Sequence, residues 1–162
     1  MGRTWKQKAL DSKDEWLTPP RLVDRLGYFD LDPCSPVARP WPTATRHYTV
    51  EDNGLVLPWE GRVWLNPPYS AVGLWMQRLA NHGNGVALVF ARTETRWFFD
   101  FVWSKANAVL FLKGRLSFCH VSGEQGKPAP APSVLVAYDE ANACSLWCVQ
   151  QFVLGGKLIT LR

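Results

Sequence analysis

The sequence has no apolar stretch of the about 18 residues that a membrane-spanning helix needs. Its longest apolar runs, such as Val86–Ala91, have the length of a strand. The opening residues, MGRTWKQKALDSKDEW, are charged and lack the apolar centre of a secretory signal peptide. The sequence therefore predicts a cytoplasmic protein that makes no membrane contact.

Cysteine is scarce, and its spacing does not suit a metal site. Cys34, Cys119, Cys144 and Cys148 form no CxxC pair, and neither Cys119-His120 nor the Cys144–Cys148 spacing is typical of zinc. A chain of 162 residues does not need disulfides for its stability. We therefore expect free thiols in a reducing compartment and no bound metal.

The composition is that of an ordinary globular protein, with 47% hydrophobic and 20% charged residues, and this excludes wholesale disorder. A net charge of +4 favours an anionic partner such as nucleic acid, although many basic proteins bind none. The length corresponds to one domain. We expect a flexible arm over residues 1–13 and a single domain over residues 14–162.

Apolar periodicity and turn signals predict alternating helices and strands. Thr18 is placed to cap a helix whose first turn contains Pro19 or Pro20 and which closes at Gly27. The other expected helices are Ala71–His82, Glu94–Lys105 and Ala141–Phe152, and the expected strands are Phe29–Asp32, Arg62–Leu65, Gly85–Ala91, Ala108–Leu112, Leu116–Val121, Ser133–Tyr138 and Lys157–Leu161.

This alternation predicts an α/β fold with a mainly parallel sheet and an antiparallel edge. The proline-rich segment Pro33–Gly61 is expected to be mostly loop, with at most a short strand or a turn of helix. Leu116–Val121 and Ser133–Tyr138 are expected to pair with each other around a loop, SGEQGKPAPAP, whose composition indicates mobility.

The motif with the most chemical content is the tetrapeptide NPPY, which follows a strand and precedes a helix. Ligands of open α/β sheets bind at this end of the strands. The side-chain oxygen of Asn66 and the carbonyl of Pro67 are two acceptors that match the two hydrogens of an exocyclic amino group, and Pro67 and Pro68 restrict their direction. Tyr69 offers a flat face for a base. The alternative is that the prolines only end the strand and the tyrosine packs.

NPPY and several further motifs resemble those of the phage-type DNA N6-adenine methyltransferases, which use S-adenosylmethionine (SAM). The resemblance covers residues 14 to about 138 in the order of the family. Its motifs are DEWLTP at Asp14–Pro19, FDLDPC at Phe29–Cys34, TVEDNGL at Thr49–Leu55 with Trp59, NPPY, ARTET at Ala91–Thr95 with Trp97, GRLSF at Gly114–Phe118, and APS at Ala131–Ser133.

The resemblance implies a Rossmann-like SAM-dependent methyltransferase fold in the cytoplasm of a bacterial host, encoded by a phage or prophage. The fold must be trimmed, because Asp32 and Asn66 lie within 34 positions and one βαβ unit already takes about 30 residues. The segment Pro33–Gly61 would replace the missing elements. SAM-dependent methyltransferases in general have a glycine-rich turn after the first strand. This chain has no glycine at the corresponding position, directly after Asp32.

For the cofactor, the resemblance implies that Thr18 and Pro19 line the methionine end of SAM. Asp32 would meet the methionine ammonium or an ordered water near it, or else is an ordinary turn residue. Asp52 would accept from the adenine amino group of SAM, or else is an ordinary turn residue, and Glu51 is the competing residue for the cofactor contact. The remaining cofactor candidates are Pro33 and Asn66.

The implied reaction is transfer of the SAM methyl group to N6 of an adenine that has left the DNA stack. The catalytic candidates are Asn66, Pro67, Pro68 and Tyr69, and the candidate DNA contacts are Arg39, Arg46, Arg92 and Arg115. Trp41 is either a core residue or an aromatic neighbour of the flipped base. The rival functions are methylation of N4-cytosine, an RNA base or protein glutamine, and a non-catalytic DNA-binding module of the same fold. No oligomeric state is implied.

Overall fold

The computed structural model describes residues 16–151 and 155–162, so the arm expected over residues 1–13 and the helix end expected at residue 152 lie outside the described residues. The helices are α2 (Pro20–Leu26), η1 (Tyr69–Ala71), α3 (Val72–His82), α4 (Arg96–Phe98), η2 (Phe99–Trp103) and α5 (Glu140–Val149). The strands are β1 (Leu31–Asp32), β2 (Arg46–His47), β3 (Val63–Leu65), β4 (Gly85–Phe90), β5 (Ala108–Leu112), β6 (Ser117–Cys119), β7 (Gln125–Pro128), β8 (Ser133–Tyr138) and β9 (Gly156–Thr160).

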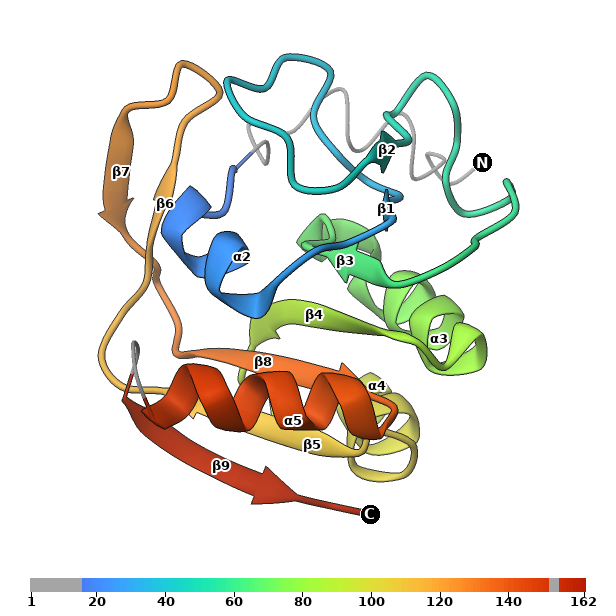
Figure 1. Cartoon of the computed structure of the whole chain (residues 1–162), viewed down its shortest axis with the longest axis vertical. Coiled ribbons are helices and arrows are strands. Elements are labelled where there is room, and N and C mark those ends of the chain that lie inside the picture. The colour runs from blue at the N-terminus through green and yellow to red at the C-terminus, as the bar shows by residue number, and fades with distance from the viewer. Residues whose placement is uncertain (1–15, 152–154) are drawn as a thin grey trace.

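Seven strands form one twisted sheet in the order β2-β1-β3-β4-β8-β5-β9 (Figure 1). The strands from β2 to β4 are parallel to their neighbours, whereas β8 is antiparallel to β4 and β5, and β9 is antiparallel to β5. Five of the seven strands therefore point the same way. The predicted α/β fold with a mainly parallel sheet is confirmed.

The pairing expected between Leu116–Val121 and Ser133–Tyr138 is wrong. Strand β8 lies inside the large sheet, with Gly85 opposite Tyr138 and Ala108 opposite Ala137. Its sequence, SVLVAY, is buried at every position, and such a strand needs a neighbour on each side and cover on both faces. Strand β6 pairs instead with β7, which forms within the segment that was expected to be a mobile loop.

Two other expectations need correction. Helix α2 begins with Pro20 and has Pro19 as its N-cap, so Thr18 does not cap it. The segment expected as one helix over Glu94–Lys105 is a single turn, α4, followed by the π-helical turn η2. The segment Pro33–Gly61 is mostly loop with one short strand, as expected; this strand, β2, pairs with β1 and widens the sheet by one strand.

Helices cover both faces of the sheet, and each face has its own apolar cluster. Helices α2 and α5 pack on one face around Trp64, with α5 drawn across β8 and β5 in Figure 1. Helix α3 and the turns α4 and η2 pack on the other face around Trp75 and Phe98. The sheet is therefore held between two layers, which leaves the ends of its strands available for a site.

Arg62 joins the helices of the first face to the sheet. Its guanidinium donates to the carbonyls of Leu26 and Tyr28, both at 2.9 Å, and to the side-chain oxygen of Asn142 on α5 at 2.5 Å. It also lies over the ring of Phe29, 4.2 Å from the centroid. One side chain thus binds the last carbonyl of α2, a carbonyl of the segment that follows it, and a residue of α5.

We expect Arg62→Met to lower the free energy of unfolding by about 3 kcal/mol, because it leaves partly buried acceptors without a donor. Urea unfolding followed by circular dichroism measures this. Arg46→Met is the matched control, since its ion pair with Glu60 at 3.3 Å is exposed and such pairs contribute about 1 kcal/mol or less. Equal losses in the two variants would contradict the bridging role.

Candidate active site

The site lies where the direction of the strand order reverses. Strand β2 follows β1 on one side and β3 lies on the other, so the segments after β1 and β3 border a crevice at the carboxyl ends of the sheet. The two segments touch, because the Cys34 thiol donates to the Asn66 carbonyl at 3.3 Å. A Cβ on Gly54 would lie 1.9 Å from the Pro33 carbonyl oxygen. The turn that carries Asp52 therefore packs directly on the segment after β1.

The NPPY segment borders a cavity of about 370 Å³. This volume lies at the lower end of the range for small-molecule sites, which suits a single base. Three of the four predicted catalytic residues, Asn66, Pro67 and Tyr69, line it. Pro68 instead precedes η1, and its carbonyl accepts from Ala71 at 3.1 Å. The other lining residues are Trp16, Phe90, Phe118, Lys127, Pro128, Ala129 and Pro130.

The amide of Asn66 has a defined orientation. Its Nδ2 donates to the backbone carbonyl of Trp16 at 3.1 Å. Because a primary amide is planar, this bond also determines where Oδ1 points. Among the residues that the structure describes, none donates to Oδ1, so the oxygen is available as an acceptor.

Tyr69 is packed on one face. Its ring stacks on Phe90, with the centroids 4.0 Å apart and the planes at 7°. Both rings line the cavity. Tyr69 therefore packs on Phe90, while its stacking on a base stays a prediction.

Asp32 is buried at the end of β1, where its side chain accepts from the Thr43 hydroxyl and from the Cys34 amide at 3.2 Å. Burial raises the pKa of this carboxyl to about 6, although the two hydrogen bonds and the charge of Arg39 lower it. The ionised carboxylate is therefore incompletely compensated in the free protein. A ligand ammonium would supply the missing positive charge.

Two further buried oxygens belong to segments expected to meet SAM. Thr18 Oγ1 and Asn53 Oδ1 have no hydrogen-bond partner among the described residues. Asn53 also has a left-handed backbone, with φ of 63°. Unpaired buried polar atoms are costly and are uncommon away from ligand sites. Thr18 and Asn53 are therefore candidates, beside Asp32, for polar contacts to a ligand.

Asp52 holds the turn in which it lies. Its carboxylate accepts from the Thr49 amide at 2.8 Å and from the Thr49 hydroxyl at 3.0 Å, while the Glu51 amide donates to that hydroxyl at 3.3 Å. The spacing Thr49-x-x-Asp52 is a capping-box signal in the sequence that predicts this arrangement. The choice between Asp52 and Glu51 as a cofactor contact stays a prediction.

The four predicted DNA contacts are scattered. Arg39 donates to the Pro36 carbonyl at 3.0 Å and lies near Asp32, whose pKa it lowers. Arg46 lies in the edge strand β2. Arg92 follows β4 and is exposed two residues beyond Phe90. Arg115 is exposed in the turn before β6. The structure places only Arg92 and Arg115 next to elements that border the cavity.

Six lining residues have no role predicted from the sequence, namely Trp16, Phe90, Phe118, Pro128, Ala129 and Pro130, whereas Lys127 is among the basic loop residues expected as phosphate contacts. Phe90 has a detectable signal, since it ends the buried strand that neighbours NPPY in the sheet. The others come from distant segments, and sequence spacing carries no signal of their proximity. Trp41, left open between core and site, does not line the cavity; its side chain lies 3.5 Å from where a Cβ of Gly123 would be.

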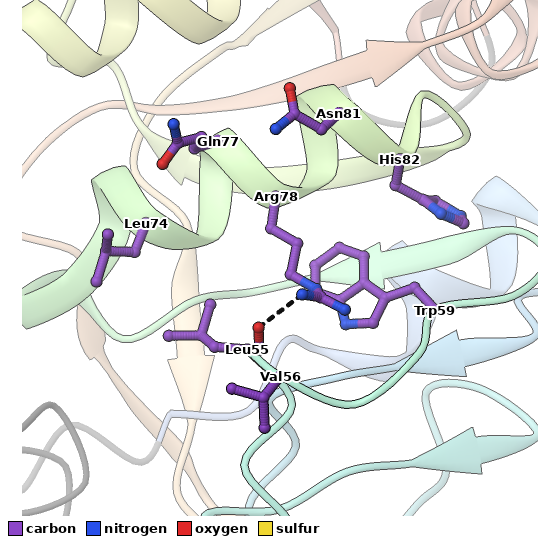
Figure 2. Close-up of a pocket in the computed structure, with 8 residues that line it drawn as sticks. All are labelled: Leu55, Val56, Trp59, Leu74, Gln77, Arg78, Asn81 and His82. Atoms are coloured by element: carbon purple, nitrogen blue, oxygen red, sulfur yellow. Dashed lines mark hydrogen bonds between the residues drawn. The ribbon is translucent and has the colours of Figure 1, made fainter.

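A second, open cavity of about 660 Å³ separates the 55–59 segment from α3 (Figure 2). Figure 2 shows Arg78 reaching from α3 to the Leu55 carbonyl, at 2.6 Å. The guanidinium also donates to the Leu57 carbonyl and lies over Trp59, 5.0 Å from the ring centroid. Arg78 therefore anchors the segment that continues from the Asp52 turn.

This combination of fold and site is that of a Rossmann-like methyltransferase. The chain belongs to the DNA N-6-adenine-methyltransferase (Dam) family, whose sequence model matches residues 6–150. The suspected family is thereby confirmed, and membership implies DNA adenine N6-methyltransferase activity. No curated protein and no solved structure matches the chain.

None of the helices in residues 16–151 and 155–162 is both long and apolar enough to span a membrane. Within the same ranges, no three His, Cys, Asp or Glu side chains cluster in a way that could hold a metal ion.

Proposed function

We propose that the protein transfers the methyl group of SAM to N6 of an adenine that has been extruded from DNA into the NPPY cavity. The observation that supports this most is the Asn66 amide, which is fixed by Trp16 and directs its oxygen away from that contact in an aromatic cavity. An exocyclic amino group with two hydrogens fits Asn66 Oδ1 and the Pro67 carbonyl. The target must leave the stack, because pairing otherwise shields this group.

Catalysis in this proposal rests on positioning and electrostatics. Asn66 and Pro67 accept both amino hydrogens, which raises electron density on the nitrogen and orients its lone pair. Tyr69, supported by Phe90, stacks on the base. No nucleophilic side chain is required, because the base itself is the nucleophile.

The cofactor would be held by the segments after β1 and before α2. Asp32 faces the methionine ammonium, and the orphan oxygens of Thr18 and Asn53 meet polar hydrogens of the ligand. Pro19 and Pro33 shape the same crevice, and Asp52 orders its outer turn. When bound, SAM supplies an electrophilic methyl: the N–C bond forms, the S–C bond breaks with its electron pair left on sulfur, and one amino proton passes to solvent.

The test is label transfer from methyl-tritiated SAM to unmethylated plasmid DNA, followed by digestion to nucleosides and chromatography. Label in N6-methyladenine supports the proposal. Label in N4-methylcytosine would show that the target base is cytosine and not adenine. The proposed positioning of the amino group by Asn66 and Pro67 would then still hold. If calorimetry detects no SAM binding and no label enters DNA, the proposal is wrong and a DNA-binding module of this fold remains.

A further inference from the structure

The hairpin β6–β7 stands apart from the large sheet as a separate two-stranded sheet, drawn beside α2 in Figure 1. The hairpin and the two residues that follow it contribute half of the cavity lining: Phe118, Lys127 and Pro128 from the strands, and Ala129 and Pro130 after β7. Phe118 and Ala129 also belong to the apolar cluster that includes the buried side chains of α2. These two residues therefore attach the hairpin to the core. The residues on this side of the cavity have no role in the methyl transfer proposed above.

Trp16 is fastened to the hairpin. The next residue, Leu17, exchanges two backbone hydrogen bonds with Cys119, both of 2.8 Å. The indole ring lies 4.7 Å from the ring of His120, and it covers Gly126, where a Cβ would meet the ring at 2.8 Å. About a third of Trp16, 37%, is exposed, and the residue lines the cavity. The ring is therefore held in place with part of its surface free.

Trp16 also connects the hairpin to the NPPY motif, because its carbonyl accepts from Asn66 Nδ2. The carbonyl thereby orients the amide whose oxygen is proposed to accept from the target amino group. Hairpin, Trp16 and Asn66 form one continuous set of contacts. A shift of the hairpin would rotate the amide.

Lys127 adds a positive charge to the cavity rim. Its side chain is exposed, and no described residue forms an ion pair or hydrogen bond with it. Two further positive charges, Lys113 and Arg115, lie in the turn before β6. The segment 113–130 therefore carries three positive charges and one negative charge, that of Glu124. An aromatic cavity with a free ammonium at its rim matches a nucleotide, whose base stacks and whose phosphate needs a cation.

We propose that the β6–β7 hairpin and Trp16 clamp the extruded nucleotide: Trp16 contacts the base and positions Asn66, and Lys127 binds a phosphate that flanks the target. This inference rests on the proposed function and adds Trp16 and Lys127 to the residues that bind the DNA substrate. The ligand class is a deoxynucleotide unit of the DNA strand, recognised through its base and its backbone charge together.

The experiment measures kcat/KM for methyl transfer into unmethylated plasmid DNA at a series of NaCl concentrations. A phosphate contact releases about one counterion, so Lys127→Gln should reduce the slope of log kcat/KM against log salt by about one. Lys157→Gln is the matched control, since Lys157 is exposed on β9 at the far edge of the sheet. Its slope should equal that of the unchanged protein.

Trp16→Ala should lower kcat/KM by at least about tenfold, the effect of a lost stacking contact, and leave the salt slope unchanged. Trp16→Phe should recover most of the activity, since an aromatic ring remains, while the backbone carbonyl that accepts from Asn66 is present in both variants. Trp147→Phe, at an exposed position on α5, is the control. Thermal unfolding of each variant identifies any that fails to fold.

An unchanged slope in Lys127→Gln, or full activity in folded Trp16→Ala, would overturn the clamp while leaving the proposed function intact. Absence of N6-methyladenine with the unchanged protein would instead overturn the proposed function, and the clamp with it.

Discussion

Asn66→Ala should lower kcat for methyl transfer by about 10³-fold, with a change of only a few-fold in KM for DNA. The substitution removes an acceptor that is oriented in advance toward the reacting amino group, and the loss of one such group typically costs 10²–10³ in kcat. Since Tyr69, Phe90 and the hairpin still bind the base, ground-state binding is largely kept. Steady-state kinetics with tritiated SAM give both constants.

Asn81→Ala is the matched control for this substitution. Asn81 lies on α3 beside the second cavity, and its side-chain oxygen accepts from Lys105 at 3.1 Å. Asn66→Asp tests the orientation: an oxygen remains, but the bond to the Trp16 carbonyl is lost. Its kcat should therefore fall between those of the unchanged protein and Asn66→Ala. If folded Asn66→Ala kept a kcat within about twofold of Asn81→Ala, Asn66 would have no part in the chemistry.

The sequence predicts the positions of the candidate site residues where these residues follow strands. Asp32 and Asn66 each end a parallel strand, and the reversal of strand order brings such ends together. A strand followed by a rigid turn and a helix is a local pattern, so NPPY could be placed in the fold without a structure. The same reasoning reaches Phe90, which ends the next strand.

Contacts between distant segments could not be predicted in this way. Trp16 precedes Asn66 by 50 positions, and their bond runs through a backbone carbonyl that any residue possesses. The pairing of β8 was misassigned for a related reason. Periodicity shows that Ser133–Tyr138 is a strand buried on both faces, but it does not identify the neighbouring strands. Here the choice is made by the apolar strands β4 and β5, which leave a gap between them for β8.

Asp52 is a residue for which the sequence carries a local structural signal beside the cofactor role that the family resemblance implies, and that role stays a prediction. The Thr49-x-x-Asp52 spacing predicts a capping box, and the structure contains its bonds. Asn53, which directly follows, carries the unpaired oxygen instead. In this turn the residue that completes the local hydrogen bonds and the residue left available for a ligand are neighbours.

The pKa of Asp32 predicts a pH dependence of stability in the free protein. Its folded pKa of about 6 lies above the unfolded value, near 3.9, so the folded state binds the proton more tightly. Stability should therefore rise as the pH falls from above 6 to below 4, by up to about 3 kcal/mol from this residue. Asp32→Asn should lose this dependence. Chemical unfolding at several pH values measures it.

SAM binding should depend on pH in the opposite direction. If the ionised carboxylate of Asp32 meets the ligand ammonium, affinity should be highest above pH 6 and fall as the carboxyl is protonated. Asp32→Asn should weaken binding by about 10- to 100-fold, the range for a hydrogen bond between charged groups. Its affinity should be nearly independent of pH.

Calorimetric titration of SAM at pH 5, 6 and 7.5 distinguishes this role from that of a turn residue. Asp100→Asn is the control, because Asp100 is exposed and pairs only with Arg96 at 3.3 Å among its described neighbours. If Asp32 only holds the turn through Thr43 and Cys34, its substitution changes stability and its pH dependence, while SAM affinity stays constant from pH 5 to 7.5. If Asp32→Asn changes both the stability and the SAM affinity, with opposite pH dependences, the buried carboxylate lowers the stability of the free protein. The positive charge of the bound ligand then offsets this cost.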